Sequence, residues 1–280
     1  MHPIYFHIKQ SLADIYPEGE SSALAKWIAI EVLGLTTVEL YAGKDNKIST
    51  QKLRTLNDII QRLKRYEPLQ YILGETSFCG FPFSVNPDVL IPRPETEELV
   101  AWIVADHISK SSVSILDIGT GSGCIAISLA RLLSGAAVSA YDVSPEALRI
   151  ASANARLNDV KVGFRQVDIL HVDVPLRQFD VIVSNPPYIT LSEKPGMDHN
   201  VTDWEPELAL FVPNDDPLLF YRTIARKAKN MLISGGNLYF EINQAYGDNT
   251  VQMMQNMGYA DVELRKDING NDRMVKGRLL

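Results

Sequence analysis

The chain has 280 residues, of which 46% are hydrophobic and 22% are charged, a composition that is ordinary for a soluble globular protein. Its length allows one large domain or two unequal domains. No apolar run approaches the roughly 18 residues that a membrane-spanning helix needs, and the first residues lack the pattern of a secretory signal. We therefore expect no association with a membrane.

The formal net charge is −7, and it is divided unevenly along the chain. Residues 1–73 contain nine Lys and Arg and eight Asp and Glu, a net charge of +1, which leaves −8 on residues 74–280. A protein that held phosphate backbones over a long surface would need the opposite sign on its larger part. Direct binding of nucleic acid is therefore not expected.

Cysteine and histidine usage argues against two further kinds of site. The two cysteines, Cys79 and Cys124, lie in unrelated contexts, which favours free thiols in a reducing compartment over a disulfide framework. The five histidines show no spacing with cysteines or carboxylates that is typical of metal ligands. We predict a cytoplasmic protein without a metal site.

Residues 1–73 predict a small bundle of helices. The clearest helix has an apolar stripe at spacings of three and four residues, formed by Leu53, Leu56, Ile60 and Leu63. Ser49 or Thr50 is a suitable N-cap for that helix. Another amphipathic helix is expected to begin after Ser21 and Ser22 and to end near Gly34. Both a substrate-recognition role and a purely stabilising role fit this bundle.

The sequence changes character after residue 73. Phenylalanines among glycines and prolines favour a short hairpin over residues 74–90. A proline-rich turn at 91–94 then leads into a helix, whose start Thr96 or Glu97 is expected to cap or charge. We therefore divide the chain into an N-terminal helical bundle (1–73), a hairpin linker (74–90) and a larger domain (91–280).

Strands and helices alternate after residue 112, which predicts an α/β fold with helices on both faces of one sheet. Strands are expected at 113–116, 137–141, 160–166, 179–183 and 237–242. Helices are expected at 125–133, 145–157, 218–232 and 249–257. Two terminal strands are expected near 262–264 and 273–276, joined by the turn-forming pair Asn269-Gly270, so that an antiparallel strand closes the sheet.

A glycine-rich turn with the pattern G-x-G-x-G follows the first of these strands. Glycines allow a tight turn and a close approach by a ligand, and the start of the next helix is expected to offer free N–H groups. Cys124 stands where a dinucleotide fingerprint has Gly or Ala. An acid directly before the turn would repel a pyrophosphate but favour a cationic ligand. The candidate cofactor residues of the turn are Asp117, Gly119, Thr120, Gly121, Ser122 and Gly123.

Further polar residues end the next strands, where ligands bind to sheets of this kind. Asp142 follows 23 positions after Gly119 and is suited to accept hydrogen bonds from ribose hydroxyls. Asp168 could accept from an adenine amino group, while Ile169 packs against the ring. Each acid alone is typical of a solvated strand end. Their recurrence at successive strand ends, with Asn185 at the next one, predicts a shared cofactor site.

The segment Ser184-Asn185-Pro186-Pro187-Tyr188 follows the apolar run at 179–183. A sheet interior cannot hold two prolines, because proline lacks the N–H that the ladder needs. The residue before each proline is also restricted to extended geometry. The carbonyl oxygens of Asn185 and Pro186 are therefore expected to form a fixed pair of acceptors for an –NH2 group, with Tyr188 packing on its flat side. A strand terminator with a packed tyrosine is the alternative.

Together these motifs resemble the Rossmann-like fold of the S-adenosylmethionine-dependent methyltransferases over roughly residues 91–280. Asn-Pro-Pro-Tyr after the fourth strand is similar to the motif of enzymes that methylate planar exocyclic or amide –NH2 groups. That group includes adenine and cytosine DNA methyltransferases, some ribosomal RNA guanine methyltransferases and protein glutamine methyltransferases.

Four further segments resemble the release-factor glutamine methyltransferases, the HemK/PrmC family: 68–74, 91–97, 205–210 and 267–273. With the helical bundle, this resemblance spans essentially the whole chain. It implies protein methylation in translation termination, with S-adenosylmethionine as the cofactor. Gly119–Gly123, Asp142 and Ile169 would line the cofactor site. The glutamine of the Gly-Gly-Gln loop of peptide chain release factors would be bound by Asn185, Pro186, Pro187 and Tyr188.

The resemblance implies catalytic roles for Asn185, Pro186 and Tyr188, which would orient the substrate amide. One departure is Asp216-Pro217, where the family usually has Asp-Gly. Three alternatives share parts of the pattern. A glutamine methyltransferase acting on a ribosomal protein shares most of it. A nucleic-acid adenine or guanine methyltransferase is disfavoured by the charge of −8, and a nicotinamide-dependent oxidoreductase is disfavoured by Cys124 and the proline pair.

Overall fold

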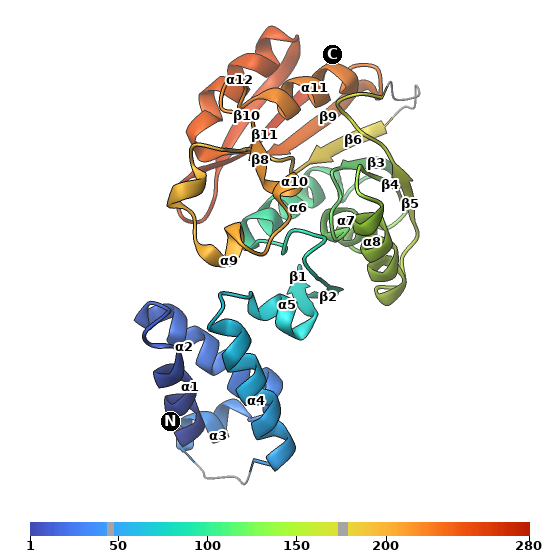
Figure 1. Ribbon diagram of the computed structural model, residues 1–280. Coiled ribbons are helices and arrows are strands. Elements are labelled where there is room, and N and C mark those ends of the chain that lie inside the picture. Colours follow the sequence, from blue (N-terminus) through green and yellow to red (C-terminus); the bar gives the residue numbers. More distant parts are fainter. Residues whose placement is uncertain (44–47, 173–178) are drawn as a thin grey trace. The chain divides into compact units, whose positions relative to one another are not determined.

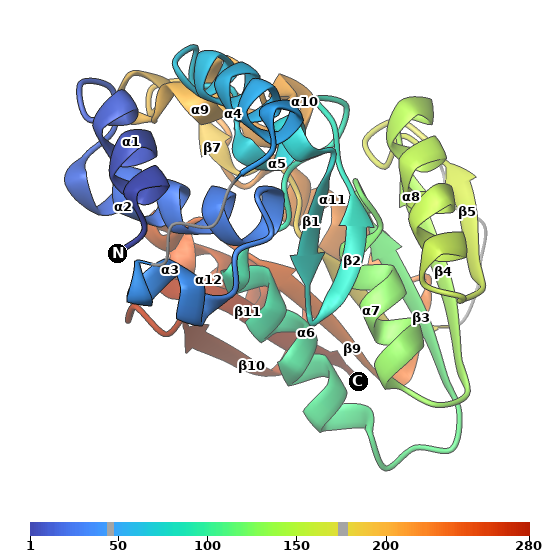
Figure 2. The same ribbon diagram turned by 90° about the horizontal axis from the view of Figure 1, so that it is seen from below.

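The computed structural model describes residues 1–43, 48–172 and 179–280, and Figures 1 and 2 show it from two directions. Its contacts divide the chain into two compact units. The first consists of Met1–Leu73 and His199–Trp204, and the second of Gly74–Asp198 and Glu205–Leu280.

The first unit is helical. Its elements are α1 (Pro3–Leu12), α2 (Glu18–Trp27), the π-helical turn η1 (Ile28–Val32), α3 (Thr37–Ala42), α4 (Thr50–Leu63), α5 (Leu69–Leu73) and α9 (His199–Thr202). The predicted stripe of α4 is buried at Leu56, Ile60 and Leu63, whereas Leu53 is exposed. Ser49 is the N-cap of α4, because its side chain accepts from Lys52 N at 3.3 Å.

Helix α2 begins earlier than the sequence predicts. Its N-cap is Pro17, so Ser21 and Ser22 lie inside the first turns instead of preceding them. Both hydroxyls donate to Glu18 O, at 3.1 and 2.6 Å, a bond that serines commonly make within helices. The helical segment ends near Gly34 as predicted, where the positive φ of 71° favours glycine.

The first unit also contains a short segment from the middle of the chain, His199–Trp204. The His199 ring lies 5.1 Å from the Tyr66 ring, centroid to centroid. Trp204 Nε1 donates to Arg65 O at 3.1 Å. These contacts fix the segment to the end of α4, although more than 130 residues separate it from that helix in the sequence.

The second unit contains a seven-stranded sheet in the order β10-β11-β9-β6-β3-β4-β5. The strands are β3 (Val113–Ile118), β4 (Ala136–Asp142), β5 (Val162–Gln166), β6 (Phe179–Ser184), β9 (Leu232–Glu241), β10 (Tyr259–Lys266) and β11 (Asp272–Leu279). Strands β9, β6, β3, β4 and β5 are parallel, and β11 is antiparallel to both of its neighbours. The predicted α/β sheet with an antiparallel terminal strand is confirmed.

Helices cover both faces of this sheet, as Figure 2 shows for α6 and α7 on one face. Helices α6 (Pro94–His107), α7 (Cys124–Leu132) and α8 (Pro145–Leu157) pack on one apolar core, and α11 (Leu219–Ala228) and α12 (Gly247–Asn256) pack on the other. Smaller elements are β7 (Ile189–Thr190), η2 (Lys194–Gly196), α10 (Glu207–Leu210), β8 (Phe211–Val212) and η3 (Gln244–Tyr246). Helix α11 ends before the predicted residue 232, because β9 already begins there.

A hairpin lies at the start of the second unit. Strands β1 (Glu75–Phe78) and β2 (Phe81–Ser84) pair antiparallel through Cys79 and Gly80, which have φ of 49° and 77°. Such left-handed angles at both central residues suit a tight hairpin turn. Phe78 and Phe83 are buried in the core beneath α6 and α7, so the hairpin folds with the second unit.

Gly123, at the start of α7, is required by close packing of two helices. Its φ is 83°, and a Cβ there would lie 2.9 Å from Ile127 Cδ1 and 3.1 Å from Ala151 Cβ in α8. The left-handed angle alone disfavours any other residue. The third glycine of the turn therefore serves the contact of α7 with α8.

We predict that Gly123→Ala lowers the free energy of unfolding by about 2–5 kcal/mol, since the left-handed angle costs about 1–2 kcal/mol and overpacking adds about 1–3 kcal/mol. Gly270→Ala is the matched control, because Gly270 has φ of 85° but open space where a Cβ would lie. Urea denaturation of the full chain should show the smaller loss for the control. Equal losses would mean that α8 moves away from Gly123 without cost.

Candidate active site

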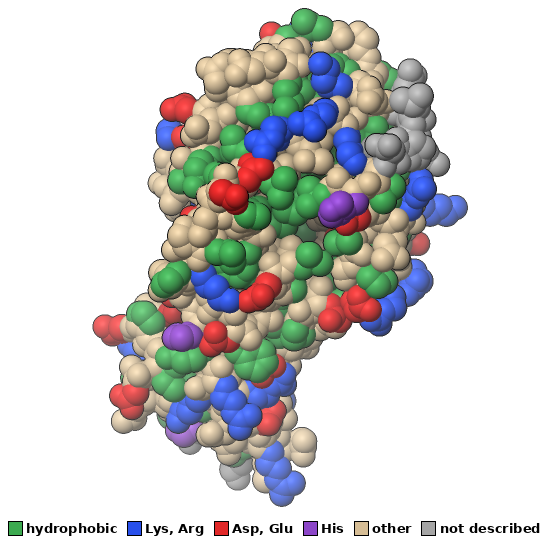
Figure 3. Space-filling model, turned by 45° about the horizontal axis from the view of Figure 1, so that its top comes forward, with side chains coloured by type: hydrophobic (Ala, Val, Ile, Leu, Met, Phe, Trp, Pro, Cys, Tyr) green, Lys and Arg blue, Asp and Glu red, His purple; other side chains and the backbone are tan. Residues whose placement is uncertain are grey.

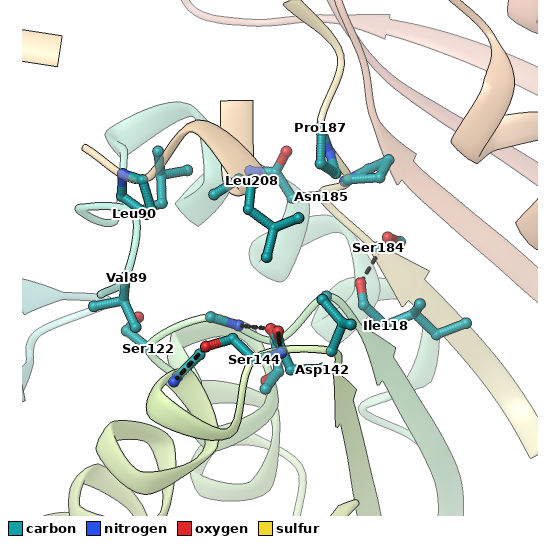
Figure 4. A pocket seen from close by; sticks show the side chains of 18 of the residues that line it. Val89, Leu90, Ile118, Ser122, Asp142, Ser144, Ser184, Asn185, Pro187 and Leu208 are labelled. Atoms are coloured by element: carbon teal, nitrogen blue, oxygen red, sulfur yellow. Dashed lines mark hydrogen bonds between the residues drawn. The ribbon is translucent and has the colours of Figure 1, made fainter. Parts of the chain in front are cut away.

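A cavity of about 480 Å³ opens at the carboxyl ends of strands β3, β4 and β6, where ligands bind to parallel sheets. Figure 4 shows it from close by. Most of the predicted site residues line it: Gly119, Thr120, Gly121, Ser122, Asp142, Asp168, Ile169, Asn185, Pro186 and Pro187. Asp117, Gly123 and Tyr188 lie outside this lining.

The rest of the lining is largely apolar. Val89 and Leu90 face the cavity from a loop, and Leu208 faces it from helix α10. In the space-filling view, hydrophobic side chains gather around a hollow in this part of the molecule (Figure 3). Leu208 is 60% exposed, so its side chain offers apolar surface at the edge of the cavity. The cavity therefore suits a ligand with a substantial apolar part.

The glycine-rich turn has most of its N–H groups occupied by the protein itself. Gly119 N and Thr120 N both donate to Tyr141 O, at 2.8 and 3.0 Å. Gly121 N donates to Asp142 Oδ2 at 2.8 Å. The backbone N–H groups of these three turn residues are therefore not free to bind a ligand, because the end of β4 already accepts them.

What the turn offers a ligand is open space. Gly119 and Gly121 have φ of 74° and 53°, and no atom lies within 4 Å of the place where a Cβ would be built on either. A side chain at these positions would fill part of the cavity wall. The first two glycines thus permit a close approach of a ligand to the backbone.

Asp117 lies under the turn and is completely buried. Its Oδ2 accepts from Thr120 Oγ1 at 2.6 Å, and its Oδ1 has no hydrogen-bond partner among the described residues. Burial raises the pKa of Asp117 to about 7, with a smaller contribution from the nearby Asp142. A desolvated carboxyl group of this kind is stabilised by positive charge nearby. Positive charge close to the buried Asp117 would therefore be favourable.

Asp142 stands at the end of β4 with both carboxylate oxygens held in place (Figure 4). Oδ2 accepts from Gly121 N at 2.8 Å and Oδ1 from Ser144 N at 2.9 Å. Burial raises the pKa of Asp142 above its usual value, while these backbone donors oppose the rise. Each oxygen keeps a second lone pair, so the Asp142 carboxylate can accept hydrogen bonds from two neighbouring hydroxyl groups of a ligand.

Asp168 and Ile169 follow β5. Asp168 Oδ1 accepts from Leu170 N at 2.9 Å, and Oδ2 lies 2.7 Å from Nδ1 of His171. The contact with His171 lowers the pKa of Asp168. Ile169 is buried in the apolar core beside Val167 and still reaches the cavity wall. This pair therefore gives the cavity an apolar wall with an anchored acid beside it.

The proline pair ends β6 as the sequence predicts. Ser184 is the last strand residue, and its Oγ donates to Ile118 O at 2.7 Å, which joins the ends of β6 and β3 (Figure 4). Asn185 Nδ2 donates to Thr96 Oγ1 at 3.4 Å. No donor to Asn185 Oδ1 is found within the described part of the chain. This oxygen is therefore available to accept from a ligand.

Tyr188 is placed behind this segment. Its hydroxyl donates to Glu241 Oε1 at 3.3 Å, and its carbonyl accepts from Asn243 Nδ2 at 3.1 Å. Burial raises the pKa of the Tyr188 hydroxyl, and the nearby Glu241 carboxylate adds to the rise. The packing of its ring on a substrate amide stays a prediction.

From the sequence alone, neither Thr96 nor Glu241 is assigned to the site. The N-cap of α6 is Arg93, so Thr96 does not cap this helix, whereas Glu97 places negative charge in its first turn as expected. Thr96 Oγ1 donates instead to Glu241 Oε2 at 2.6 Å. The one available signal is that Glu241 follows the apolar run Leu238–Phe240, which places a lone acid at the end of a buried strand.

Arg93 and Glu205 form a second link between distant segments at the cavity. Arg93 lines the cavity and donates through its guanidinium to Glu205 Oε1. Glu205 is buried and also accepts from Ile91 N at 3.4 Å. Burial raises the pKa of Glu205, whereas Arg93 opposes the rise. The ion pair ties the turn before α6 to the turn before α10.

Within the described residues no group of three or more His, Cys, Asp or Glu side chains could hold a metal ion. Cys79 and Cys124 are both free thiols. None of the helices described is both long and apolar enough to cross a bilayer.

Two family models match the chain. The PrmC N-terminal domain matches residues 6–74, and the methyltransferase small domain matches residues 99–200. Among solved structures, a methyltransferase from Pyrococcus furiosus has a TM-score of 0.54 and 16% identity, and the match covers 82% of this chain and 98% of that one. That likeness supports the methyltransferase fold of the second unit.

Relatives of high identity match almost the whole sequence. A release factor glutamine methyltransferase of Bacteroides thetaiotaomicron is 51% identical, and the match covers 98% of this chain and 99% of that protein. A release factor glutamine methyltransferase of Flavobacterium psychrophilum is 47% identical, with 95% of each chain covered. Because the identity is this high over nearly the full length of both proteins, the chain belongs to the release factor glutamine methyltransferase family.

Proposed function

We propose that this protein transfers a methyl group from S-adenosylmethionine to the side-chain amide nitrogen of the glutamine in the Gly-Gly-Gln motif of peptide chain release factors. The observation that carries the proposal is the acceptor group at the end of β6. Asn185 and Pro186 line the cavity beside the glycine-rich turn, and Asn185 presents an oxygen that no described residue occupies. The names of the close relatives support the choice of release factors as substrates.

The residues of the cavity fit S-adenosylmethionine. The open space beside Gly119 and Gly121 admits a ligand to the backbone, and the unpartnered oxygen of Asp117 favours positive charge above it. Asp142 would accept from the ribose hydroxyls, and Ile169 would pack on the adenine, with Asp168 near its amino group. When bound, S-adenosylmethionine supplies an electrophilic methyl group on a positively charged sulfur.

The role of the protein in the reaction is to orient a weak nucleophile. An amide nitrogen shares its lone pair with the carbonyl group, and no side chain of the cavity is basic enough to deprotonate it. Asn185 Oδ1 and Pro186 O would accept the two N–H bonds and hold the lone pair toward the methyl group. The same acceptors stabilise positive charge as it develops on nitrogen. Correct placement can contribute about 7–11 kcal/mol relative to free encounter.

Pro187 and Tyr188 complete the substrate side in this proposal. Pro187 lines the cavity next to Asn185, and Tyr188 would pack against the flat amide once a substrate is bound. The two free thiols fit a reducing compartment, so we place the protein in the cytoplasm, where release factors act. The net charge of −7 argues against a long nucleic-acid surface.

We predict that Asn185→Ala lowers the rate of methyl transfer to a recombinant release factor by at least about 100-fold, the size of effect that loss of one transition-state hydrogen bond can have. The dissociation constant for S-adenosylmethionine, measured by calorimetry, should change little. Thermal unfolding checks that the variant is folded. Equal losses of turnover and of cofactor affinity would instead make Asn185 a structural or cofactor residue.

We predict that Asp142→Ala raises the dissociation constant for S-adenosylmethionine at least about tenfold, since a hydrogen bond to a charged group contributes about 1.5–3 kcal/mol. Ser144→Ala is the matched control, because it removes the N-cap of α8 at Ala147 N but leaves the carboxylate. Calorimetry should show the larger loss of affinity for Asp142→Ala. An unchanged dissociation constant in that variant would refute the ribose role.

A further inference from the structure

A chain of hydrogen bonds runs from the partly buried Asn185 to two buried side chains behind the acceptor segment. Asn185 Nδ2 donates to Thr96 Oγ1 at 3.4 Å, and Thr96 Oγ1 donates to Glu241 Oε2 at 2.6 Å. Thr96 is 2% exposed and Glu241 is 1% exposed. The three residues come from α6, the end of β6 and the end of β9, so the chain joins three elements next to the cavity.

The chemistry of these groups fixes the direction of each bond. An ionised carboxylate can only accept, so the single proton of the Thr96 hydroxyl must go to Glu241. The Thr96 oxygen then faces Asn185 as an acceptor. Asn185 must present its NH2 group to that oxygen, and its own oxygen turns to the other side of the amide. The orientation of Asn185 therefore follows from the hydrogen bond that Thr96 donates to Glu241.

Three groups around Glu241 oppose the effect of burial on its pKa. Burial raises the pKa of Glu241, while the Thr96 hydroxyl, the positive Arg273 of β11 and the Tyr188 hydroxyl oppose that rise. Tyr188 donates to the other oxygen, Oε1, at 3.3 Å. Both oxygens of Glu241 thus accept hydrogen bonds, and neither has to donate one.

We propose that Thr96 and Glu241 are positioning residues that lock the side-chain amide of Asn185 with its oxygen facing the substrate. This inference rests on the proposed function, in which Asn185 has to accept an N–H of the substrate amide. A rotated Asn185 would present N–H to N–H and repel the substrate. The alternative is that the chain only ties α6 to β9 and has no effect on Asn185.

The first test is Thr96→Val, which keeps the shape and removes the hydroxyl. We expect kcat for methyl transfer to a recombinant release factor to fall about tenfold, equal to about 1.4 kcal/mol. The KM for the release factor and the cofactor dissociation constant should stay within about twofold, because an orienting group acts on kcat. Thr96→Ser, which restores the same donor and acceptor, should recover kcat to within about twofold.

Thr250→Val is the matched control, because Thr250 is also fully buried and donates to a carbonyl, Tyr246 O at 2.8 Å, in α12. It should leave kcat unchanged. In an Asn185→Ala background, adding Thr96→Val should lower kcat by less than about twofold further, since the effect of Thr96 passes through Asn185. The proposal would be overturned if kcat were unchanged in Thr96→Val, or if the losses of the two single variants added in the double variant. It would also be overturned if weaker cofactor binding explained the loss of activity.

A spectroscopic readout separates this proposal from the proposed function. The side-chain NH2 signals of Asn185 in nitrogen–proton spectra are identified by their loss in Asn185→Ala. We expect them to shift in Thr96→Val but not in Thr250→Val. Unshifted signals overturn the lock whatever the activity is. Signals that shift in Thr96→Val would support the lock even if the wild-type chain methylates no release factor, and that lack of activity would refute the proposed substrate.

Discussion

The parallel pairing of β3 with β4 and with β6 is the constraint on which the whole site depends. Ile118 pairs with Tyr141 on one side and with Ser184 on the other. The residues that follow, Gly119, Asp142 and Asn185, therefore emerge at one level. A slip of one residue in either pairing would turn each side chain to the opposite face of the sheet. The site is thus made by sheet register, and the loops only complete it.

Strand ends are also the part of the site that sequence reasoning could find. A buried strand is an apolar run that stops at a polar residue, so Asp142 and Asn185 are visible without knowledge of their neighbours. The hydrogen bonds of the glycine-rich turn were not visible, because their acceptor is the carbonyl group of Tyr141 at the end of another strand. The pair of Thr96 and Glu241 spans 145 residues, and no local pattern encodes such a contact.

Burial of carboxyl groups next to the cavity has an energetic consequence. Asp117 and Glu241 are both inaccessible to solvent, and burial raises the pKa of each. Their partners differ: Glu241 has donors on both oxygens, whereas Asp117 has one oxygen without a partner. An apolar residue at position 117 would avoid the desolvation penalty. Burial of Asp117 therefore destabilises the free protein, and a positively charged ligand bound nearby would compensate for this loss.

The two acceptors at the end of β6 differ in how they are held. Pro186 O belongs to the backbone, and the following proline restricts the torsion angles that aim it. Asn185 Oδ1 ends a side chain whose last torsion is broad and roughly twofold, so the sequence of the strand end does not decide which atom faces the cavity. That decision requires a group outside the segment, and Thr96, 89 residues earlier, is in contact with the amide. The motif alone therefore supplies one fixed acceptor, and the fold supplies the second.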